Sequence, residues 1–472
     1  MKSIATILCF ILSTVIYAQE GYEIKVTLKP FKNQYIYLGH YYGKQLPIID
    51  SVKLDANSQG VFKGTKKLGG GIYLVGYPDK SQYFEFLLDK NQRFSIVADA
   101  AKPDALSFQN SPDNVDFRAY QQFMAVNGKR LDSLTTARKN TAPADSIRII
   151  AQILDQNRKI RAYRTNIITN KSKTFLATLL KAMQEPDMAI DPEVLKDKPM
   201  SYEYYKKHYW DGVDFFDDRL VRTPFFEGRI DKYLEQVVYP AADSVIRELD
   251  YMLSYASISE DMQRFLLLKF ANRYLNQKFM WEDAVFVHLF EKYFSGKTYP
   301  WLNAQGMKVI TDRAYSLMAN ITGTPASEIE LTDTAGKKTS LYSLEAPYTI
   351  VTIWDPTCGH CKEVLPQLDS AYRARWKSMG VKVFGLAKET DGKKSDWITF
   401  IQNNKLQDWR HVYYSKVEDV ARTGSGIPSY SQLYDVQTFP TLYLLDKDKR
   451  IIAKKVTIQQ IDEILSHREK NQ

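Results

Sequence analysis

Two cysteines near the C-terminus have the spacing for redox chemistry. Cys358 and Cys361 are separated by two residues and follow an apolar run that ends at Trp354. At the start of a helix, the positive end of the helix dipole and unpaired backbone N–H groups favour a cysteine thiolate. Cys361 would lie about one turn further on, within reach of a mixed disulfide on Cys358. We therefore predict that Cys358 is the nucleophile and Cys361 the resolving cysteine.

His360 stands between the two cysteines. A protonated imidazole would add positive charge beside Cys358, favour the thiolate, and move the couple toward the oxidising end of the range of disulfide oxidoreductases. The alternative is that His360 is an exposed helix residue without a chemical role. The sequence leaves both interpretations open.

Metal binding is another common use of a Cys-x-x-Cys pair. Structural zinc needs four protein ligands, and the sequence has no second Cys pair and no His-x-x-x-His motif. The other histidines stand singly along the chain: His40, His208, His288, His411 and His467. We expect no metal site and no other cofactor.

The third cysteine, Cys9, lies in an apolar run that ends near Ala18. This run is shorter than the roughly 18 to 20 residues that span a bilayer, so residues 1–18 are predicted to be a signal peptide. We expect an exported protein with no transmembrane segment after cleavage. An exported chain that keeps only Cys358 and Cys361 is better explained by redox turnover than by crosslinking, because so short a loop constrains the unfolded chain little.

The bulk composition indicates a globular protein of several domains. The chain has 472 residues, of which 44% are hydrophobic and 25% charged, which is too long for one hydrophobic core. Its formal net charge is +9, but the basic residues are scattered and form no long run. Such a distribution is typical of a solvated surface, so we expect no nucleic-acid binding.

Hydrophobic periodicity divides the mature chain into domains. Across residues 19–105, apolar and polar residues alternate between turn signals, which predicts an antiparallel β domain. Across residues 106–320 the period becomes helical, as in Val245, Leu249 and Met252, which predicts an all-α domain. Its clusters of Tyr and Phe are interpreted as core rather than as a partner groove.

Strand and helix patterns alternate in residues 321–472. Tyr348–Trp354 is predicted to be a buried strand, the cysteine pair opens a helix, and Val381–Leu386 is a second strand. A final hairpin and a closing helix follow. This order predicts an α/β domain with a mixed sheet flanked by helices on both faces.

These residues resemble the thioredoxin superfamily, and in particular its exported TlpA/ResA-type branch. The resemblance is carried by Trp354 ahead of the Cys358-Gly359-His360-Cys361 motif, by Pro366 in the following helix, and by Phe439-Pro440-Thr441 before a strand. It implies a thioredoxin-like fold and thiol-disulfide oxidoreductase activity. The preceding regions resemble β and helical modules found beside such domains in envelope proteins of Gram-negative bacteria.

The resemblance also implies that Pro440 is the family's cis-proline beside the active site. A cis bond would present the backbone of Thr438 and Phe439 to an extended substrate segment, which could pair with it as an added strand. The alternative is a trans proline that opens a strand.

The sequence departs from the family pattern where a proton acceptor for Cys361 is expected. Thr352 and Val364 occupy the positions at which related proteins carry an acid. Glu363 is offset by one position, about 100° around a helix. Glu363, Glu389 or a water molecule are the candidates for proton acceptor.

The expected function is that of a periplasmic protein-disulfide reductase. Its partners would be disulfide-containing proteins or small thiols, together with an external electron donor. One alternative is an oxidase or isomerase that uses the same residues, which His360 favours. Another is an envelope binding protein in which the thioredoxin-like fold is only a platform.

Overall fold

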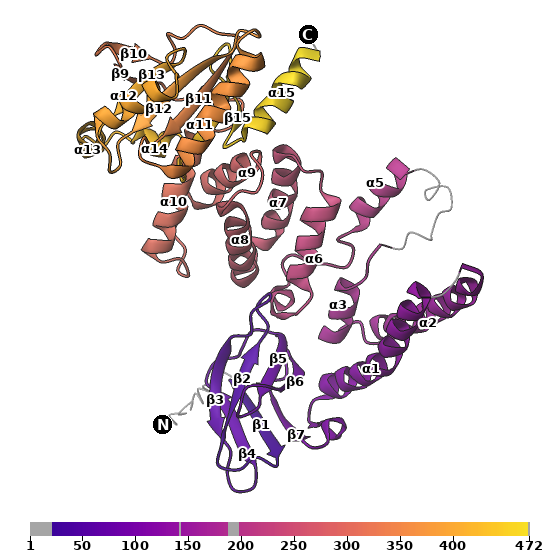
Figure 1. Cartoon of the computed structure of the whole chain (residues 1–472). Helices are drawn as coiled ribbons and strands as arrows, with labels where there is room; N and C mark the ends of the chain where they lie inside the picture. The colour runs from indigo at the N-terminus through magenta and orange to yellow at the C-terminus, as the bar shows by residue number, and fades with distance from the viewer. Residues whose placement is uncertain (1–20, 141–142, 187–197, 471–472) are drawn as a thin grey trace, which may run out of the picture. The chain divides into compact units, whose positions relative to one another are not determined.

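The computed structural model describes residues 21–140, 143–186 and 198–470 (Figure 1). The predicted signal peptide, residues 1–18, lies outside the described residues. The chain forms two compact units, which are described separately. The first covers the described residues up to Val238 together with Tyr251–Phe265, and the second covers Tyr239–Asp250 and the described residues from Leu266 onward.

Two four-stranded sheets, in the orders β4-β1-β7-β8 and β3-β2-β5-β6, form the start of the first unit. Their strands are β1 Tyr22–Lys29, β2 Tyr35–His40, β3 Ile48–Lys53, β4 Gln59–Gly64, β5 Gly71–Gly76, β6 Tyr83–Leu88, β7 Arg93–Asp99 and β8 Ser107–Gln109. Ile24, Leu38 and Phe86 contribute to a core between the sheets. The predicted antiparallel β domain is confirmed, with one parallel pairing, between β1 and β7.

Helices dominate the middle of the chain. They are α1 Pro112–Lys139, α2 Pro143–Asn170, α3 Phe175–Ala182, α5 Lys198–His208, α6 Phe226–Lys232, α7 Ala242–Ala256, α8 Glu260–Leu275, α9 Glu282–Leu289 and α10 Ala304–Met318. Tyr209, Trp210 and Phe215 are buried, as expected of core residues, whereas Phe216 is exposed. The predicted helical region is confirmed. Among the described residues, no helix combines the length and apolar character needed to cross a bilayer.

The second unit contains a seven-stranded mixed sheet with the order β10-β9-β13-β12-β11-β14-β15. Its strands are β9 Glu330–Asp333, β10 Lys338–Ser340, β11 Tyr348–Trp354, β12 Lys382–Lys388, β13 Arg410–Tyr414, β14 Thr441–Asp446 and β15 Ile451–Lys454. The helices of this domain are α11 Gly359–Ala371, α12 Lys394–Asn403, α13 Lys416–Gly424, α14 Tyr430–Leu433 and α15 Ile458–Lys470. Strand β11 runs parallel to β12 and antiparallel to β14, which confirms the predicted mixed α/β sheet.

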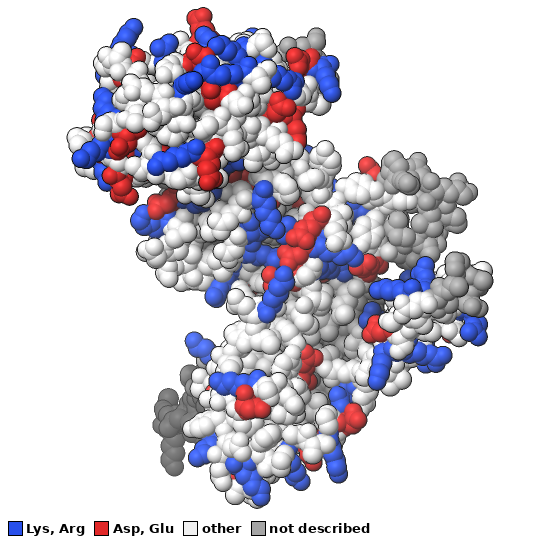
Figure 2. All heavy atoms as spheres, in the orientation of Figure 1, with Lys and Arg blue, Asp and Glu red and all other residues white. Residues whose placement is uncertain are grey.

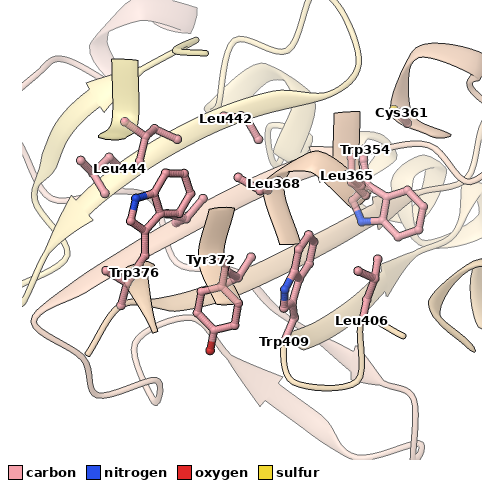
Figure 3. Close-up of a cluster of buried hydrophobic side chains, with 14 of the residues drawn as sticks. Trp354, Cys361, Leu365, Leu368, Tyr372, Trp376, Leu406, Trp409, Leu442 and Leu444 are labelled. Atoms are coloured by element: carbon pink, nitrogen blue, oxygen red, sulfur yellow. The ribbon is translucent and has the colours of Figure 1, made fainter. Parts of the chain in front are cut away.

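Apolar side chains cover both faces of this sheet. As a result, nearly every residue of the central strand β11 is buried. On one face, Trp354, Leu365 and Trp376 belong to a cluster that joins β11 to α11 (Figure 3). On the other face, Val351 and Ile353 pack in a second cluster. Such a strand holds the turn that follows it rigidly, since it is fixed from both sides.

A buried ion pair joins α9 to the sheet edge. The ammonium of Lys454 on β15 contacts the carboxylate of Asp283 and donates to the backbone oxygen of Asn320 at 2.8 Å. Both charged side chains are almost fully buried, at 3% and 4% exposure. Burial lowers the pKa of Lys454 and raises that of Asp283. Each charge therefore depends on its partner.

Asp283→Asn should lower the free energy of unfolding by about 3–5 kcal/mol, because it leaves the Lys454 charge buried without a counter-ion. Chemical denaturation followed by tryptophan fluorescence measures the change. The matched control is Lys308→Met, which removes an exposed pair with Asp312 and should change stability by less than about 0.5 kcal/mol. Equal losses in the two variants would contradict the prediction.

Candidate active site

The cysteine motif lies where the central strand β11 gives way to α11. Cys358 occupies the N-cap position, with φ −66° and ψ 123°, and α11 begins at Gly359. Pro366 lies inside this helix. The buried strand fixes the turn, and the turn places Cys358 at the N-terminus of the helix, where its side chain accepts no capping hydrogen bond.

The two sulfurs differ in their access to solvent. Cys358 is partly exposed, whereas Cys361 is fully buried and belongs to the hydrophobic cluster between β11 and α11 (Figure 3). Both are free thiols. Burial, the largest influence, raises the pKa of Cys361 far above its ordinary value. A substrate can therefore reach Cys358 but not Cys361, and Cys361 needs help to lose its proton.

The loop before β14 completes the site on the other side of Cys358. The Phe439–Pro440 peptide bond is cis. The Cys358 thiol points at the backbone oxygen of Phe439, with sulfur and oxygen 3.9 Å apart. The hydroxyl of Thr441 donates to the oxygen of Thr438 at 2.6 Å. Thr438, Phe439 and Pro440, which were named from the family resemblance, thus meet the cysteine motif in space.

His360 and Glu363 lie on the solvent side of α11. His360 Nδ1 is 3.9 Å from Glu363 Oε2, and the side chains are 67% and 77% exposed. The charge of His360 is therefore largely screened by water. Gly359 has open space where a β-carbon would stand, so no close contact requires a glycine there.

The acid that the sequence reasoning missed is Asp355, in the turn between β11 and Cys358. It is 4% exposed. Its Oδ1 accepts hydrogen bonds of 2.7 Å from both the backbone N–H and the hydroxyl of Thr357, and its Oδ2 accepts one from the hydroxyl of Thr390. The backbone oxygen of Asp355 accepts from the N–H of Cys358 at 3.2 Å, and a backbone hydrogen bond between Asp355 and the Cys361 sulfur acts to lower the pKa of that thiol.

After burial, the Cys358 thiol and the negative charge of the Asp355 carboxylate also act to raise the pKa of Cys361, and Asp355 is the carboxylate with the larger effect there. Glu389 instead accepts a 3.0 Å hydrogen bond from the Tyr413 hydroxyl. The signal available in the sequence was an acid directly after Trp354. Its significance depends on Thr390, which is distant in sequence.

A cleft of about 750 Å³ opens beside the cysteine motif; His360 and Pro440 line it, whereas Cys358 itself does not. Its walls are the first turns of α11, the loop that contains Thr438 and Pro440, and the residues that join β15 to α15. His360 and Lys455 are its charged or titratable side chains. The cleft therefore offers a substrate a mainly apolar surface, with side chains such as Val364, Leu442 and Ile458, and few charges.

The arrangement holds no group of three or more His, Cys, Asp or Glu that could bind a metal ion, among the residues that the structure describes.

Three families match successive parts of the chain. Residues 322–454 match the AhpC/TSA family. This part of the chain belongs to that thioredoxin-like family. Residues 22–117 and 154–317 match two domains of unknown function, DUF4369 and DUF5106. The modules ahead of the AhpC/TSA domain are therefore recurrent domains in their own right.

A ResA relative confirms the TlpA/ResA-type resemblance, and solved structures are similar to parts of the chain. A thiol-disulfide oxidoreductase ResA of Bacillus cereus is 25% identical over 150 residues, which cover 31% of this chain and 77% of that protein. A domain of a possible thiol-disulfide isomerase from Cytophaga hutchinsonii is 31% identical, with 32% of this chain and 94% of that chain covered and a TM-score of 0.27. A thioredoxin-like protein from Bacteroides caccae is 21% identical, with 61% and 98% covered and a TM-score of 0.43.

Proposed function

We propose that the protein is a periplasmic protein-disulfide reductase. The observation that carries the proposal is the pair of sulfurs, one accessible at a helix N-cap and the other buried within the next turn. Thiol-disulfide exchange needs one sulfur that can meet a substrate and a second that is protected until a mixed disulfide forms. The oxidoreductase relatives support the same chemistry.

The reaction runs in two exchanges. The Cys358 thiolate attacks one sulfur of the substrate disulfide, forms a mixed disulfide and releases the other substrate sulfur as a thiolate, which takes a proton from water. Cys361 then gives up its proton and attacks the Cys358 sulfur, which releases the second substrate thiol. Two electrons pass to the substrate, and the protein is left with a Cys358–Cys361 disulfide. An external dithiol donor must return the two electrons.

Asp355 is the group to which we assign the proton of Cys361. It is buried beside that thiol, whereas Glu363 is exposed on α11 and Glu389 is engaged with Tyr413. The three carboxylates thus differ in position rather than in chemical type.

The direction of transfer is proposed from the ResA relatives, and the reduction potential tests it. A value near that of thioredoxin, about −270 mV, is expected for a reductase, and a value above about −180 mV would identify an oxidase or isomerase. The solvent-exposed position of His360 favours the reductase, because a screened charge stabilises the Cys358 thiolate little.

Cys361→Ser should accumulate mixed disulfides with substrate proteins, because no second thiol is left to attack the Cys358 sulfur and release the substrate. Non-reducing gels of envelope extracts, followed by mass spectrometry of dithiothreitol-sensitive bands, would identify them. The Cys358→Ser, Cys361→Ser double variant is the control and should trap nothing. Absence of dithiothreitol-sensitive bands from the single variant would count against the proposed function.

A further inference from the structure

A buried carboxylate, Asp435, ties the helical region to the loop beside Cys358. Asp435 follows α14 in the left-handed backbone region, at φ 43°, and its side chain is 6% exposed. Its Oδ1 accepts hydrogen bonds from Arg313 Nη1 at 2.6 Å and from Ser316 Oγ at 3.1 Å. Its Oδ2 pairs with the ammonium of Lys455. Asp435 therefore joins two cations that lie on different elements.

Arg313 and Ser316 belong to α10, and further contacts fix that helix against the same segment. Arg313 Nε donates to the backbone oxygen of Leu275 at 3.0 Å, and this hydrogen bond fixes the orientation of the guanidinium toward Asp435. Just after the end of α10, the side chain of Asn320 donates to the backbone oxygen of Leu433 at 3.0 Å. Leu433 and Asp435 are thus bound to α10 and the residues that follow it, the first through its backbone and the second through its side chain.

The other side of Asp435 leads into the active site. Lys455 lines the cleft beside the cysteine motif, and so does Gln437, whose amide lies 3.5 Å from Asp435 Oδ1. The same loop continues to Phe439, whose backbone oxygen meets the Cys358 thiol. A displacement of Asp435 would therefore move both Gln437 and Lys455, which line two walls of the cleft.

The charge on Asp435 is maintained by its partners. Burial acts to raise the pKa of this carboxyl, but the hydrogen bonds from Lys455 and Arg313 outweigh burial and hold the pKa below its ordinary value. If Asp435 moved away from Arg313, a buried charge would be left without a counter-ion. The arrangement in which the two side chains are in contact is therefore strongly preferred.

We propose that Arg313 and Asp435 are positioning residues for disulfide exchange, through which α10 holds the loop 436–440 and Lys455 in the form that receives a substrate. This inference rests on the proposed function. It gives the end of the DUF5106 region, which matches residues 154–317, a part in the reaction of the neighbouring domain. Neither residue touches the reacting sulfurs.

Asp435→Asn and Arg313→Met in the full chain test the proposal. Asparagine also tolerates the left-handed backbone, so the first variant removes the charge with little change of shape. We expect kcat/KM for reduction of insulin, with dithiothreitol as donor, to fall about 10-fold, mainly through KM, because displaced positioning groups weaken productive binding. The rate at which iodoacetamide alkylates Cys358 should stay within about 2-fold, and Arg313→Lys should recover part of the loss.

The matched control is Arg373→Met, which removes an arginine bound to Asp369 and Asp408 near the far end of α11 and should leave kcat/KM unchanged. Normal kcat/KM in both test variants would overturn this inference alone. Loss of Cys358 alkylation and of kcat/KM together would also overturn it, because it would show general disruption. A wild-type chain that reduces no disulfide would instead count against the proposed function.

Discussion

Cys358→Ser should lower kcat/KM for disulfide reduction at least about 10³-fold, because a serine hydroxyl cannot attack a disulfide at neutral pH and no other thiol of the described chain is accessible. Cys361 cannot take over, since it is fully buried. The measurement is insulin reduction with dithiothreitol as donor, corrected for the rate without protein. Cys361→Ser should also stop turnover, but only after one exchange.

Alkylation separates a loss of chemistry from a loss of structure. Iodoacetamide should label Cys358 in the folded reduced protein, whereas Cys361 should react only after unfolding, as its burial requires. Cys358→Ser should therefore show no labelling under native conditions and an unchanged melting temperature. Full turnover in Cys358→Ser would contradict the reductase proposal and favour the alternative of an envelope binding protein with a thioredoxin-like platform.

The parts of the fold that depend on local pattern could be predicted from the sequence. The apolar run Tyr348–Trp354 and the residues after it predicted a buried strand that leads into a helix, and the structure has β11 followed by α11. The parallel pairing of β1 with β7 could not be predicted, because it joins strands separated by several others. Partner choice of that kind depends on the packing of the whole domain.

The same limit applies to the site. The cysteine pair and Pro440 were found because their residue types and the family resemblance point to them directly. Asp355 and Asp435 were not found, because an acid in a loop, even one directly after Trp354, does not by itself indicate a role. Each gains its role from partners far along the chain, Thr390 in one case and Arg313 in the other.

On the face drawn in Figure 2, basic and acidic side chains are interspersed over the described parts of the chain, as expected of a solvated surface. Substrate choice is therefore better sought in the cleft beside the cysteine motif, whose lining includes no acidic side chain. The partners of the protein, its electron donor included, remain predictions that the trapping experiment addresses.

Asp355→Asn should slow the release of substrate from the mixed disulfide about 10²-fold at pH 7, because the Cys361 thiol loses its proton acceptor. Removing the Asp355 charge also makes the Cys361 thiolate slightly easier to form. That opposing effect is the smaller one, since burial is the largest cause of the raised pKa of Cys361 and persists in the variant. Stopped-flow release of a fluorescent substrate thiol measures the rate.

The rate of substrate release by Asp355→Asn should increase with pH. The raised pKa keeps Cys361 protonated at neutral pH, so without Asp355 the reactive thiolate forms only as hydroxide increases. Release by Asp355→Asn should therefore rise about tenfold for each pH unit between 6 and 9, and the deficit should shrink toward high pH. Glu363→Gln and Glu389→Gln are the matched controls and should keep the wild-type profile. If Glu389→Gln rather than Asp355→Asn gave the hydroxide-dependent profile, the proton of Cys361 would have to leave by the Tyr413 side of the site instead.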